Sequence, residues 1–334
     1  MIGRRETWTL RGVVGEKNHP LVSLSSCVVA LCLGLAATPH LLAETPREDR
    51  SLAWAGCGIS KHSFMRELAE TYQEETGIEI QLAGGGATHG IRAVDAGKID
   101  MGGSCRHALD YEEEKSPKLI PIAWDALVVV VHPDNPVGDI RHEQLAAIYS
   151  GEITRWRQLE STAPDEPIRV YAREGKISGV GYMSRIMLFS DPERDYAATH
   201  WFRSSGPLET ALQNDPFGIA LTGISSALRR DLKLLELDGV RPSEDSLLAG
   251  TYRFARPLFL VVPPEGDNPD VEQFVRWARS ESGQSAIKDT GAVPVNDITL
   301  ATWNRYRDFM AQAHQDLSAL ERILSELTTA GQDG

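Results

Sequence analysis

Strand patterns alternate with helix patterns along most of this 334-residue chain, and this alternation restricts its fold more than any other feature. One strand is expected at 51–55 and the next at 78–82. Between them, Phe64, Leu68 and Tyr72 share one face of a helix. Repeated units of this kind are typical of α/β proteins with mainly parallel sheets. The length corresponds to roughly two domains.

Two long apolar segments differ from the short strands. Residues 121–131 form the first, and its run of four valines at 128–131 predicts burial on both faces of a sheet. Residues 252–262 form the second, in which Pro257 favours an edge position or a bend. We expect the first segment to cross between two domains.

The remaining elements are shorter, apart from an amphipathic C-terminal helix. Leu317, Leu320, Ile323, Leu324 and Leu327 form its apolar stripe, and we expect it to pack on a domain. The pattern predicts strands at 99–101, 168–171, 218–221 and 234–237, and helices at 91–96, 143–149, 182–189, 208–213, 270–282 and 300–327.

An arginine and a serine-glycine turn lie between the strand at 168–171 and the helix at 182–189. Free N–H groups and the helix dipole favour negative charge at such a helix N-terminus. Arg173 would add a two-pronged positive partner, and the Ser178 hydroxyl one more donor. The turn therefore indicates an anion-binding site, although an ordinary turn with a surface arginine has the same residues.

Three further loops share small or hydroxyl residues where a strand ends or a helix begins. They are residues 56–61, 84–90 and 104–106, and the second contains three consecutive glycines. In α/β folds, ligands bind near the carboxyl ends of strands. Four loops of this kind could surround a compact oxyanion with short-range donors.

The first 43 residues are typical of a secretory signal peptide. Basic residues from Arg4 to Lys17 precede an apolar run at 21–43, and cleavage is expected after Ala43. Pro39 interrupts the run, which argues against a membrane anchor. We therefore expect a periplasmic protein, with lipid anchoring through Cys27 as a minor alternative.

The chain is acidic, with a net charge of −13, and becomes more acidic without its basic leader. Nucleic-acid binding normally requires a basic face, so we expect no nucleic-acid partner. The same charge opposes the approach of an anion, so local dipoles and a few arginines must bind it. Cys57 and Cys105 remain after processing, and the sequence leaves open whether they form a disulfide.

Several segments resemble, in the same order, the phosphate-binding proteins of ABC transporters. Residues 84–91 are similar to their GGGSGTGI segment, and residues 148–156 to IFSGKITNW. Residues 100–106, 125–136 and 256–259 resemble DIGMASR, DGIAVVVNPDNP and SRPLY. The resemblance extends from about residue 53 to residue 292 and so covers most of the mature chain.

This resemblance implies the type 2 periplasmic binding-protein fold, with two α/β domains joined by two crossover strands around a ligand cleft. The implied domains are 44–126 plus 253–300 and 127–252, followed by a helical extension at 301–334. It also implies a monomer that binds inorganic phosphate and delivers it to an ABC permease. No enzymatic activity, metal or cofactor is implied.

The resemblance also implies a set of ligand-binding residues. From the first domain these are Ser60, the backbone of Lys61 and Thr88, with Arg106 neutralising charge. From the second domain they are Arg173, Ser178 and Gly179.

Three positions depart from the family pattern. Ala87 and Val180 stand where the family usually has serine and threonine, so two hydroxyl donors are missing. Some members place an aspartate near Cys105 that accepts a proton from phosphate and so excludes sulfate. This chain has Cys-Arg there, and Asp125 is the candidate for a substitute acceptor.

Two other functions remain open on the residues alone. The first is a binder or sensor of another tetrahedral oxyanion. The second is a phosphate-ester hydrolase that works through Cys57, Cys105 or a serine. Neither cysteine has an arginine at the spacing of a phosphatase loop, and the chain has no nucleophile-elbow or HExxH pattern.

Overall fold

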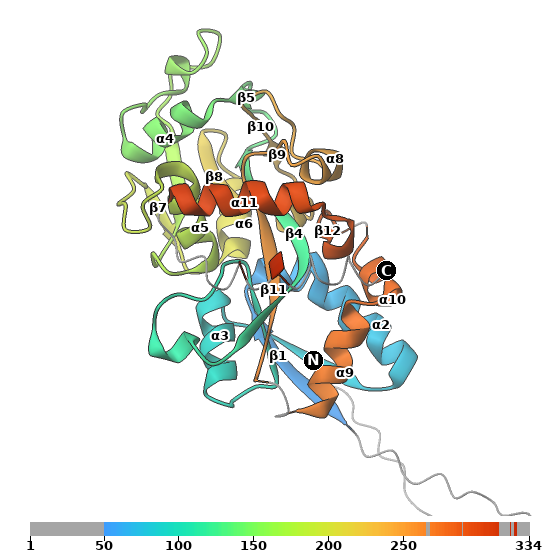
Figure 1. Cartoon of the computed structure of the whole chain (residues 1–334). Helices are drawn as coiled ribbons and strands as arrows, with labels where there is room; N and C mark the ends of the chain where they lie inside the picture. Colours follow the sequence, from blue (N-terminus) through green and yellow to red (C-terminus); the bar gives the residue numbers. More distant parts are fainter. Residues whose placement is uncertain (1–49, 265–267, 289, 314–320, 322–323, 326–334) are drawn as a thin grey trace, which may run out of the picture. The chain divides into compact units, whose positions relative to one another are not determined.

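The computed structural model describes residues 50–264, 268–288, 290–313, 321 and 324–325. These described residues belong to one compact unit (Figure 1). The predicted signal peptide at 1–43 lies outside the described residues, as do Leu317, Leu320, Ile323 and Leu327 of the predicted C-terminal stripe.

Most strands and helices lie where the sequence pattern places them. The strands are β1 (Ser51–Gly56), β2 (Glu79–Gly84), β3 (Met101–Ser104), β4 (Lys118–Val131), β5 (Asp139–Ile140), β6 (Arg169–Arg173), β7 (His200–Phe202), β8 (Gly218–Gly223), β9 (Lys233–Leu234), β10 (Glu236–Leu237), β11 (Ala255–Val262) and β12 (Val293–Pro294). The helices are α1 (Gly58–Ser60), α2 (Arg66–Thr76), α3 (Ala87–Asp95), α4 (His142–Ser150), α5 (Gly179–Phe189), α6 (Ser205–Leu212), α7 (Ile224–Ala227), α8 (Glu244–Leu248), α9 (Pro269–Ala278), α10 (Glu281–Ala286) and α11 (Leu300–Gln312).

Ten strands form one sheet whose main path runs β2-β1-β3-β11-β4-β8-β6-β7. We call β1, β2 and β3 the first strand set, and β6, β7 and β8 the second. Pairing is parallel within each set, but β4 and β11 pair antiparallel to each other and to the neighbouring strands. The prediction of a mainly parallel sheet is therefore wrong at its centre, because the two long strands run back between the sets.

Strand β4 joins the two sets, as the long apolar segment predicts. Residues up to Ala126 pair with β11, and residues from Leu127 pair with β8. Val128, Val129, Val130 and Val131 are fully buried, which confirms the predicted burial on both faces. Their side chains stabilise the strand through packing on both sides of the sheet.

Pro257 lies in the second long strand, β11, which is central in the sheet and not at its edge. Pairing with β3 begins only at Phe259, so β11 has a single neighbour at Pro257. A register shift between Leu258 and Phe259 follows the proline directly. The strand therefore accommodates the missing N–H where one side is unpaired, and it bends immediately afterwards.

Three predicted boundaries are wrong for local reasons. Helix α3 begins at Ala87, before the predicted 91, because Gly86 with φ of 88° caps it. The predicted strand at 234–237 divides into β9 and β10, which pair with β4 and β5. The predicted helix at 270–282 ends at Ala278, and Ser280 caps a separate helix, α10.

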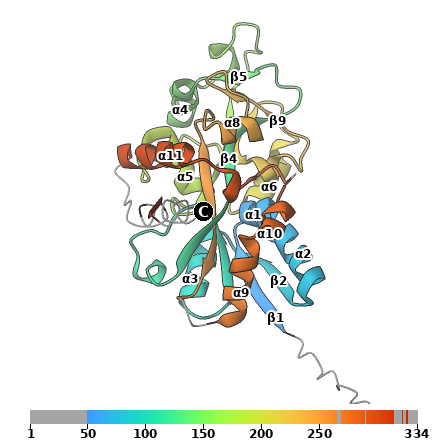
Figure 2. The ribbon, with the colours of Figure 1, turned by 45° about the vertical axis from the view of Figure 1, so that its right-hand side comes forward.

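Helix α11 crosses in front of β4 and β11 in Figure 1, and Figure 2 shows the same neighbours from the side. Trp303 of α11 packs edge-to-face on Trp124 of β4, with ring centroids 4.9 Å apart. Tyr306 packs on the same tryptophan at 5.5 Å. The predicted packing of this helix is confirmed for α11. Within the residues described, no helix combines the length and the apolar character that a membrane span needs.

Candidate functional site

The predicted ligand loops follow strands whose carboxyl ends share an edge of the sheet. Strands β2 and β3 both pair parallel with β1, so the loops that begin at Cys57, Gly85 and Cys105 emerge together. In the second set β6 pairs parallel with β8, so the loop after Arg173 emerges beside α7. This is the arrangement that places ligand-binding loops side by side in α/β folds.

The loops that follow the first strand set meet the loop that follows β6 at Gly179, the first residue of α5. A Cβ atom added to Gly179 would lie 2.3 Å from Cys105 Sγ and 3.1 Å from Ala87 Cβ. Such distances exclude any side chain at position 179 unless its neighbours move. We call the region defined by Cys57, Ala87, Cys105, Ile177 and Gly179 the loop junction.

The predicted anion-binding turn lies at the α5 end of the loop junction. Ser178 is the N-cap residue, and its Oγ accepts a hydrogen bond from Gly181 N at 3.2 Å. Gly179 and Val180 follow at the first helical positions, and both are buried. The Ser178 hydroxyl thus caps the helix, and Val180 adds no hydroxyl.

Two predicted ligand residues from the first strand set contact the loop before α5. Thr88 Oγ1 donates to Ile177 O at 3.0 Å, and Arg106 Nε donates to the same oxygen at 2.9 Å. Arg106 Nη2 also donates to Thr88 Oγ1 at 3.1 Å. These hydrogen bonds connect the two sides of the loop junction.

Arg106 forms a fully buried ion pair with Glu114. Its Nη1 and Nη2 donate to the two carboxylate oxygens at 2.7 Å and 2.9 Å, and both side chains have no exposed area. Glu114 also accepts hydrogen bonds from Leu109 N and Arg92 Nε. Burial opposes ionisation of Glu114, but Arg106 outweighs it and lowers the pKa of the carboxyl group. All three nitrogens of the Arg106 guanidinium are therefore paired within the protein.

Arg173 is also held by protein groups. Its Nε donates to Phe202 O at 3.1 Å, its Nη1 to Ser205 Oγ at 3.1 Å, and its Nη2 to Arg203 O. Burial lowers the pKa of Arg173, because the charged guanidinium is largely removed from water. The structure thus places Arg173 beside the loop junction with each of its nitrogens occupied once.

The first loop centres on the Cys57 sulfur. Ser60 N and Ser60 Oγ lie 3.3 Å and 3.1 Å from Cys57 Sγ. The backbone N–H of Lys61 donates to Cys57 O at 3.1 Å, and Lys61 Nζ donates to Leu82 O. Ser60 and the Lys61 backbone are therefore near the junction, but both make local hydrogen bonds.

The Cys57 and Cys105 thiols are both free and buried, and they interact through a side-chain hydrogen bond. Burial opposes ionisation of Cys57, but hydrogen bonds from Cys105 and Ser60 outweigh it and lower the pKa of Cys57 to about 6. The bond to Cys57, together with burial, raises the pKa of Cys105 well above its ordinary value. The pair therefore titrates as one coupled unit.

Burial of both sulfurs predicts slow alkylation of the folded protein. We expect iodoacetamide to leave Cys57 and Cys105 unmodified under native conditions and to label both after unfolding in urea. Peptide mass mapping assigns each label and separates these residues from the cysteines of the leader. Rapid labelling of either residue in the folded protein, or a disulfide-linked peptide pair, would contradict the described arrangement.

Asp125 of β4 lies behind the loop junction and pairs with Arg256 of β11. The Arg256 Nη2 to Asp125 Oδ2 distance is 3.0 Å, and both side chains have no exposed area. Burial raises the pKa of Asp125 despite the neighbouring guanidinium. Burial disfavours the charged Arg256, but electrostatic interactions with Cys105 and Asp125 and the hydrogen bond to Asp125 raise its pKa overall.

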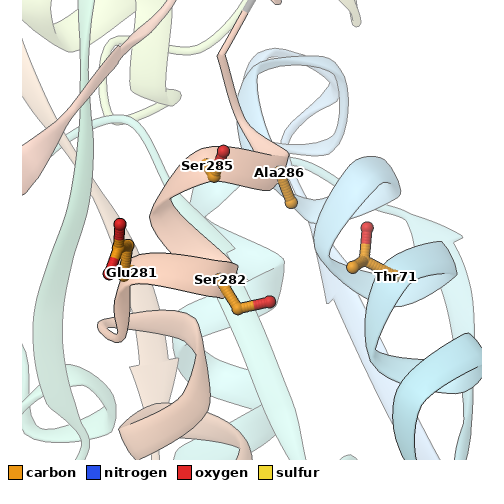
Figure 3. Close-up of a pocket in the computed structure, with 5 residues that line it drawn as sticks. All are labelled: Thr71, Glu281, Ser282, Ser285 and Ala286. Carbon is orange, nitrogen blue, oxygen red and sulfur yellow. The ribbon is translucent and has the colours of Figure 1, made fainter.

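A shallow depression of about 550 Å³ lies elsewhere, between α2 and α10. Figure 3 shows its lining residues: Thr71, Glu281, Ser282, Ser285 and Ala286. None of them is basic, so this depression lacks the charge that an oxyanion site needs. Among the residues that the structure describes, no cluster of His, Cys, Asp and Glu side chains has the arrangement of a metal site.

The sequence analysis did not identify two buried charged residues near the loop junction, Glu114 and Arg256. Glu114 lies in an acidic run, Glu112 to Glu114, which gave no sign of which residue is buried. Arg256 entered only as part of a matching segment, although an arginine within a long apolar strand is itself a signal. Its partner Asp125 lies far away in the sequence, so only strand pairing brings them together.

Comparison with known protein families gives one match over most of the described chain. Residues 56–282 match the PBP superfamily domain. Protein SphX of Synechococcus elongatus is 27% identical over 294 residues, which cover 82% of this chain and 86% of that protein. The phosphate-binding protein PstS of Pseudomonas aeruginosa is 24% identical over 257 residues, covering 70% of this chain and 80% of that protein.

Solved structures give a consistent result. A substrate-binding protein of Clostridium perfringens, crystallised with bound phosphate, aligns with a TM-score of 0.66 at 25% identity, over 74% of this chain and 100% of that one. An ABC-type phosphate transport receptor of Vibrio cholerae aligns with a TM-score of 0.58 at 25% identity, over 72% and 99% of the two chains.

Proposed function

We propose, since the chain belongs to the PBP superfamily and has the type 2 periplasmic binding-protein fold, that it is an exported solute-binding protein. It captures inorganic phosphate in a cleft between its two strand sets and delivers it to an ABC permease. The relatives named as phosphate-binding proteins and the phosphate-bound structure support this choice of ligand. We assign it no enzymatic role.

The observation that carries the proposal is the loop junction. Loops from β1, β2 and β3 meet the N-terminus of α5, and the distance from a Gly179 Cβ to Cys105 Sγ would be only 2.3 Å. Helix N-termini attract anions through their free N–H groups and their dipole. Arg173 supplies positive charge beside them, which the acidic chain as a whole does not.

The strand pairing supports the proposed domain division into 44–126 plus 253–300 and 127–252. The boundary at Ala126 and Leu127 coincides with the point where β4 changes its partner from β11 to β8. β11 begins at Ala255, close to the proposed return to the first domain. Two strands that connect the sets in this way provide a hinge for closing on a ligand.

The function predicts one phosphate bound per chain. Protein stripped of ligand by partial unfolding and refolding should bind phosphate tightly in isothermal titration calorimetry. We expect excess sulfate to change the phosphate affinity little. A site that accepts a hydrogen bond from the ligand's hydroxyl group binds hydrogen phosphate, whereas sulfate has no proton to donate. Absence of any phosphate binding by refolded protein would refute the proposal.

A second candidate is a binder or sensor of a different tetrahedral oxyanion. Ala87 and Val180 favour it, because both lie at the first turns of α3 and α5 and neither carries a hydroxyl group. Competition among phosphate, sulfate and molybdate separates the two candidates. Stronger binding of sulfate or molybdate than of phosphate would select the second.

A hydrolase is a third candidate, because Cys57 is a thiol with a lowered pKa beside the proposed anion site. Its burial and hydrogen bonds to Ser60 hold it within the protein, which supports a structural role. Turnover of a generic phosphate ester that vanished in Cys57→Ser would establish the hydrolase instead.

A further inference from the structure

Arg256 is a fully buried arginine whose hydrogen-bonding capacity is largely unused. Its Nη2 donates to Asp125 Oδ2 at 3.0 Å, whereas its Nε and Nη1 have no partner. Arg173 and Arg106, by contrast, have every guanidinium nitrogen paired with a protein group. Of these three arginines, Arg256 is therefore the one that has guanidinium nitrogens with no partner at all, whereas Arg173 keeps only the second N–H of each Nη.

Two further buried atoms near Asp125 have no hydrogen-bond partner within the described residues, namely Asp125 Oδ1 and the Ser225 hydroxyl oxygen. The backbone N–H groups of Ser225 and Ile224, at the start of α7, also interact with the Asp125 carboxylate. A buried polar atom without a partner is costly, and more so when it belongs to a charged group such as Arg256 or Asp125. Unpaired donors and acceptors on β4, β11 and α7 together indicate a place where a polar ligand supplies the missing hydrogen bonds.

These groups face the loop junction. Arg256 and Asp125 are directly opposed in the β4–β11 pairing, so both side chains lie on the same face of the sheet. The adjacent Trp124 points to the opposite face, where it contacts Trp303 of α11. Helix α11 therefore covers the other side of these strands, as Figure 1 shows.

Asp125 also lies where the two strand sets meet. A Cβ atom added to Gly223, at the carboxyl end of β8, would be 2.7 Å from Asp125 Oδ2 and 2.6 Å from Ile59 Cγ2. Ile59 belongs to the loop after β1, and Ser225 to α7 directly after β8. The unpaired atoms thus border the carboxyl ends of strands from both sets.

Electrostatic interactions connect Arg256 with the same sulfurs that border Arg173. Cys57 and Cys105 interact electrostatically with both guanidinium groups. Cys105 is in turn the residue that Gly179 contacts at the N-terminus of α5. The two arginines therefore approach the loop junction from the crossover strands and from the second strand set.

We propose that Arg256, Asp125 and Ser225 form an inner subsite that binds a protonated tetrahedral oxyanion. Arg256 Nε and Nη1 donate to two ligand oxygens, and Asp125 Oδ1 accepts the hydrogen of the ligand hydroxyl. Ser225 Oγ donates to a further oxygen. This inference rests on the proposed function and explains how a chain with Cys105 and Arg106, where some family members have an aspartate, would recognise hydrogen phosphate.

The subsite makes a fully ionised anion a poor ligand. Sulfate at neutral pH has no hydrogen to donate, so it would place an oxygen against Asp125 Oδ1 with no proton between them. Hydrogen phosphate has both the acceptor oxygens and the single donor that the unpaired atoms require. The recognised property is therefore the proton of the oxyanion.

The test is a calorimetric titration of wild-type protein and four variants with phosphate and with sulfate. Arg256→Lys keeps a positive charge next to Asp125 but removes the Nε and Nη1 donors. We expect phosphate to bind roughly 10- to 100-fold more weakly, as for lost hydrogen bonds to a charged group. Asp125→Asn removes the charge that repels sulfate, so we expect the preference for phosphate over sulfate to fall by a similar factor.

Two further variants separate recognition from folding. Arg256→Met combined with Asp125→Leu removes both buried charges together, a change that buried ion pairs often tolerate. We expect this double variant to unfold at a similar temperature but to lose phosphate binding. Arg169→Lys is the matched control, because Arg169 also pairs with an aspartate, Asp215, away from the loop junction.

The outcomes distinguish the subsite from the function. Wild-type affinity and selectivity in both Arg256→Lys and Asp125→Asn would overturn the subsite and leave phosphate binding intact. An equal loss in Arg169→Lys would also overturn it, since the effect would then be structural. A wild-type protein that binds neither anion would overturn the proposed function together with the subsite.

Discussion

Replacing Glu114 with alanine is expected to lower the free energy of unfolding by about 3–5 kcal/mol, the effect of removing one partner of a buried ion pair. The substitution leaves the Arg106 guanidinium fully buried without its counter-charge. Leu109 N and Arg92 Nε lose their acceptor at the same time. Urea denaturation followed by circular dichroism measures the change.

Glu113→Ala is the matched control, because Glu113 occupies the same short helical turn but is exposed. We expect it to change stability by less than about 0.5 kcal/mol. Equal effects of the two substitutions would show that the Arg106 pair contributes nothing to the folded state.

The Glu114 effect should also depend on pH. Arg106 holds the pKa of the folded carboxyl group below the ordinary glutamate value of 4.5. The stabilisation is therefore fully present above that value and is lost as the pH falls through the lower folded pKa. The difference in stability between wild type and Glu114→Gln should accordingly shrink in acid. A difference that stayed constant down to low pH would contradict a charged Glu114.

Replacing Gly179 with alanine is expected to weaken phosphate binding strongly with little change in thermal stability. The added methyl group would lie 2.3 Å from Cys105 Sγ and 3.1 Å from Ala87 Cβ, across the loop junction. Overpacking of this kind costs about 1–3 kcal/mol. Because this strain acts on the state in which the two sides of the loop junction are in contact around the ligand, the affinity falls by roughly 5- to 150-fold. Calorimetry measures the affinity, and a thermal melt followed by circular dichroism measures the stability.

A second substitution tests the cause. Cys105→Ala removes the sulfur atom and leaves a Cβ that is 3.8 Å from the added methyl, an ordinary contact. We expect Gly179→Ala combined with Cys105→Ala to recover most of the affinity that Gly179→Ala loses, relative to Cys105→Ala alone. Gly138→Ala is the control, because a Cβ there meets no atom within 4 Å. Failure of the double variant to recover would exclude the contact with Cys105 Sγ as the reason, because only the 3.1 Å contact with Ala87 Cβ remains in that variant.

The periodicity of apolar residues predicted most of the fold. It placed β1, β2 and β4 and marked the long strands that join the two sets. It failed where pairing between distant strands decides the local structure. The antiparallel centre of the sheet and the position of β11 between β3 and β4 depend on contacts that no short window of sequence contains.

The candidate site was predicted less completely than the fold. Cap residues and glycines indicated the N-terminus of α5, because Ser178 and Gly179 satisfy requirements set within one turn. The ligand contacts assigned to Ser60, Lys61, Thr88, Arg106, Arg173, Ser178 and Gly179 stay predictions. Several of these side chains already have partners in the protein, and the sequence gave no means of foreseeing that.

The sequence by itself determined that this chain forms an α/β protein with small-residue loops at the ends of its strands, because each of those features follows from local spacing and local backbone conformation. Only the tertiary structure decided which charged side chains are fully hydrogen-bonded within the protein and which keep unpaired atoms. Arg106 is neutralised by Glu114, whereas Arg256 keeps unpaired donors beside Asp125. Hydrogen-bond satisfaction depends on which residues strand pairing brings together, and the partners here are far apart along the chain.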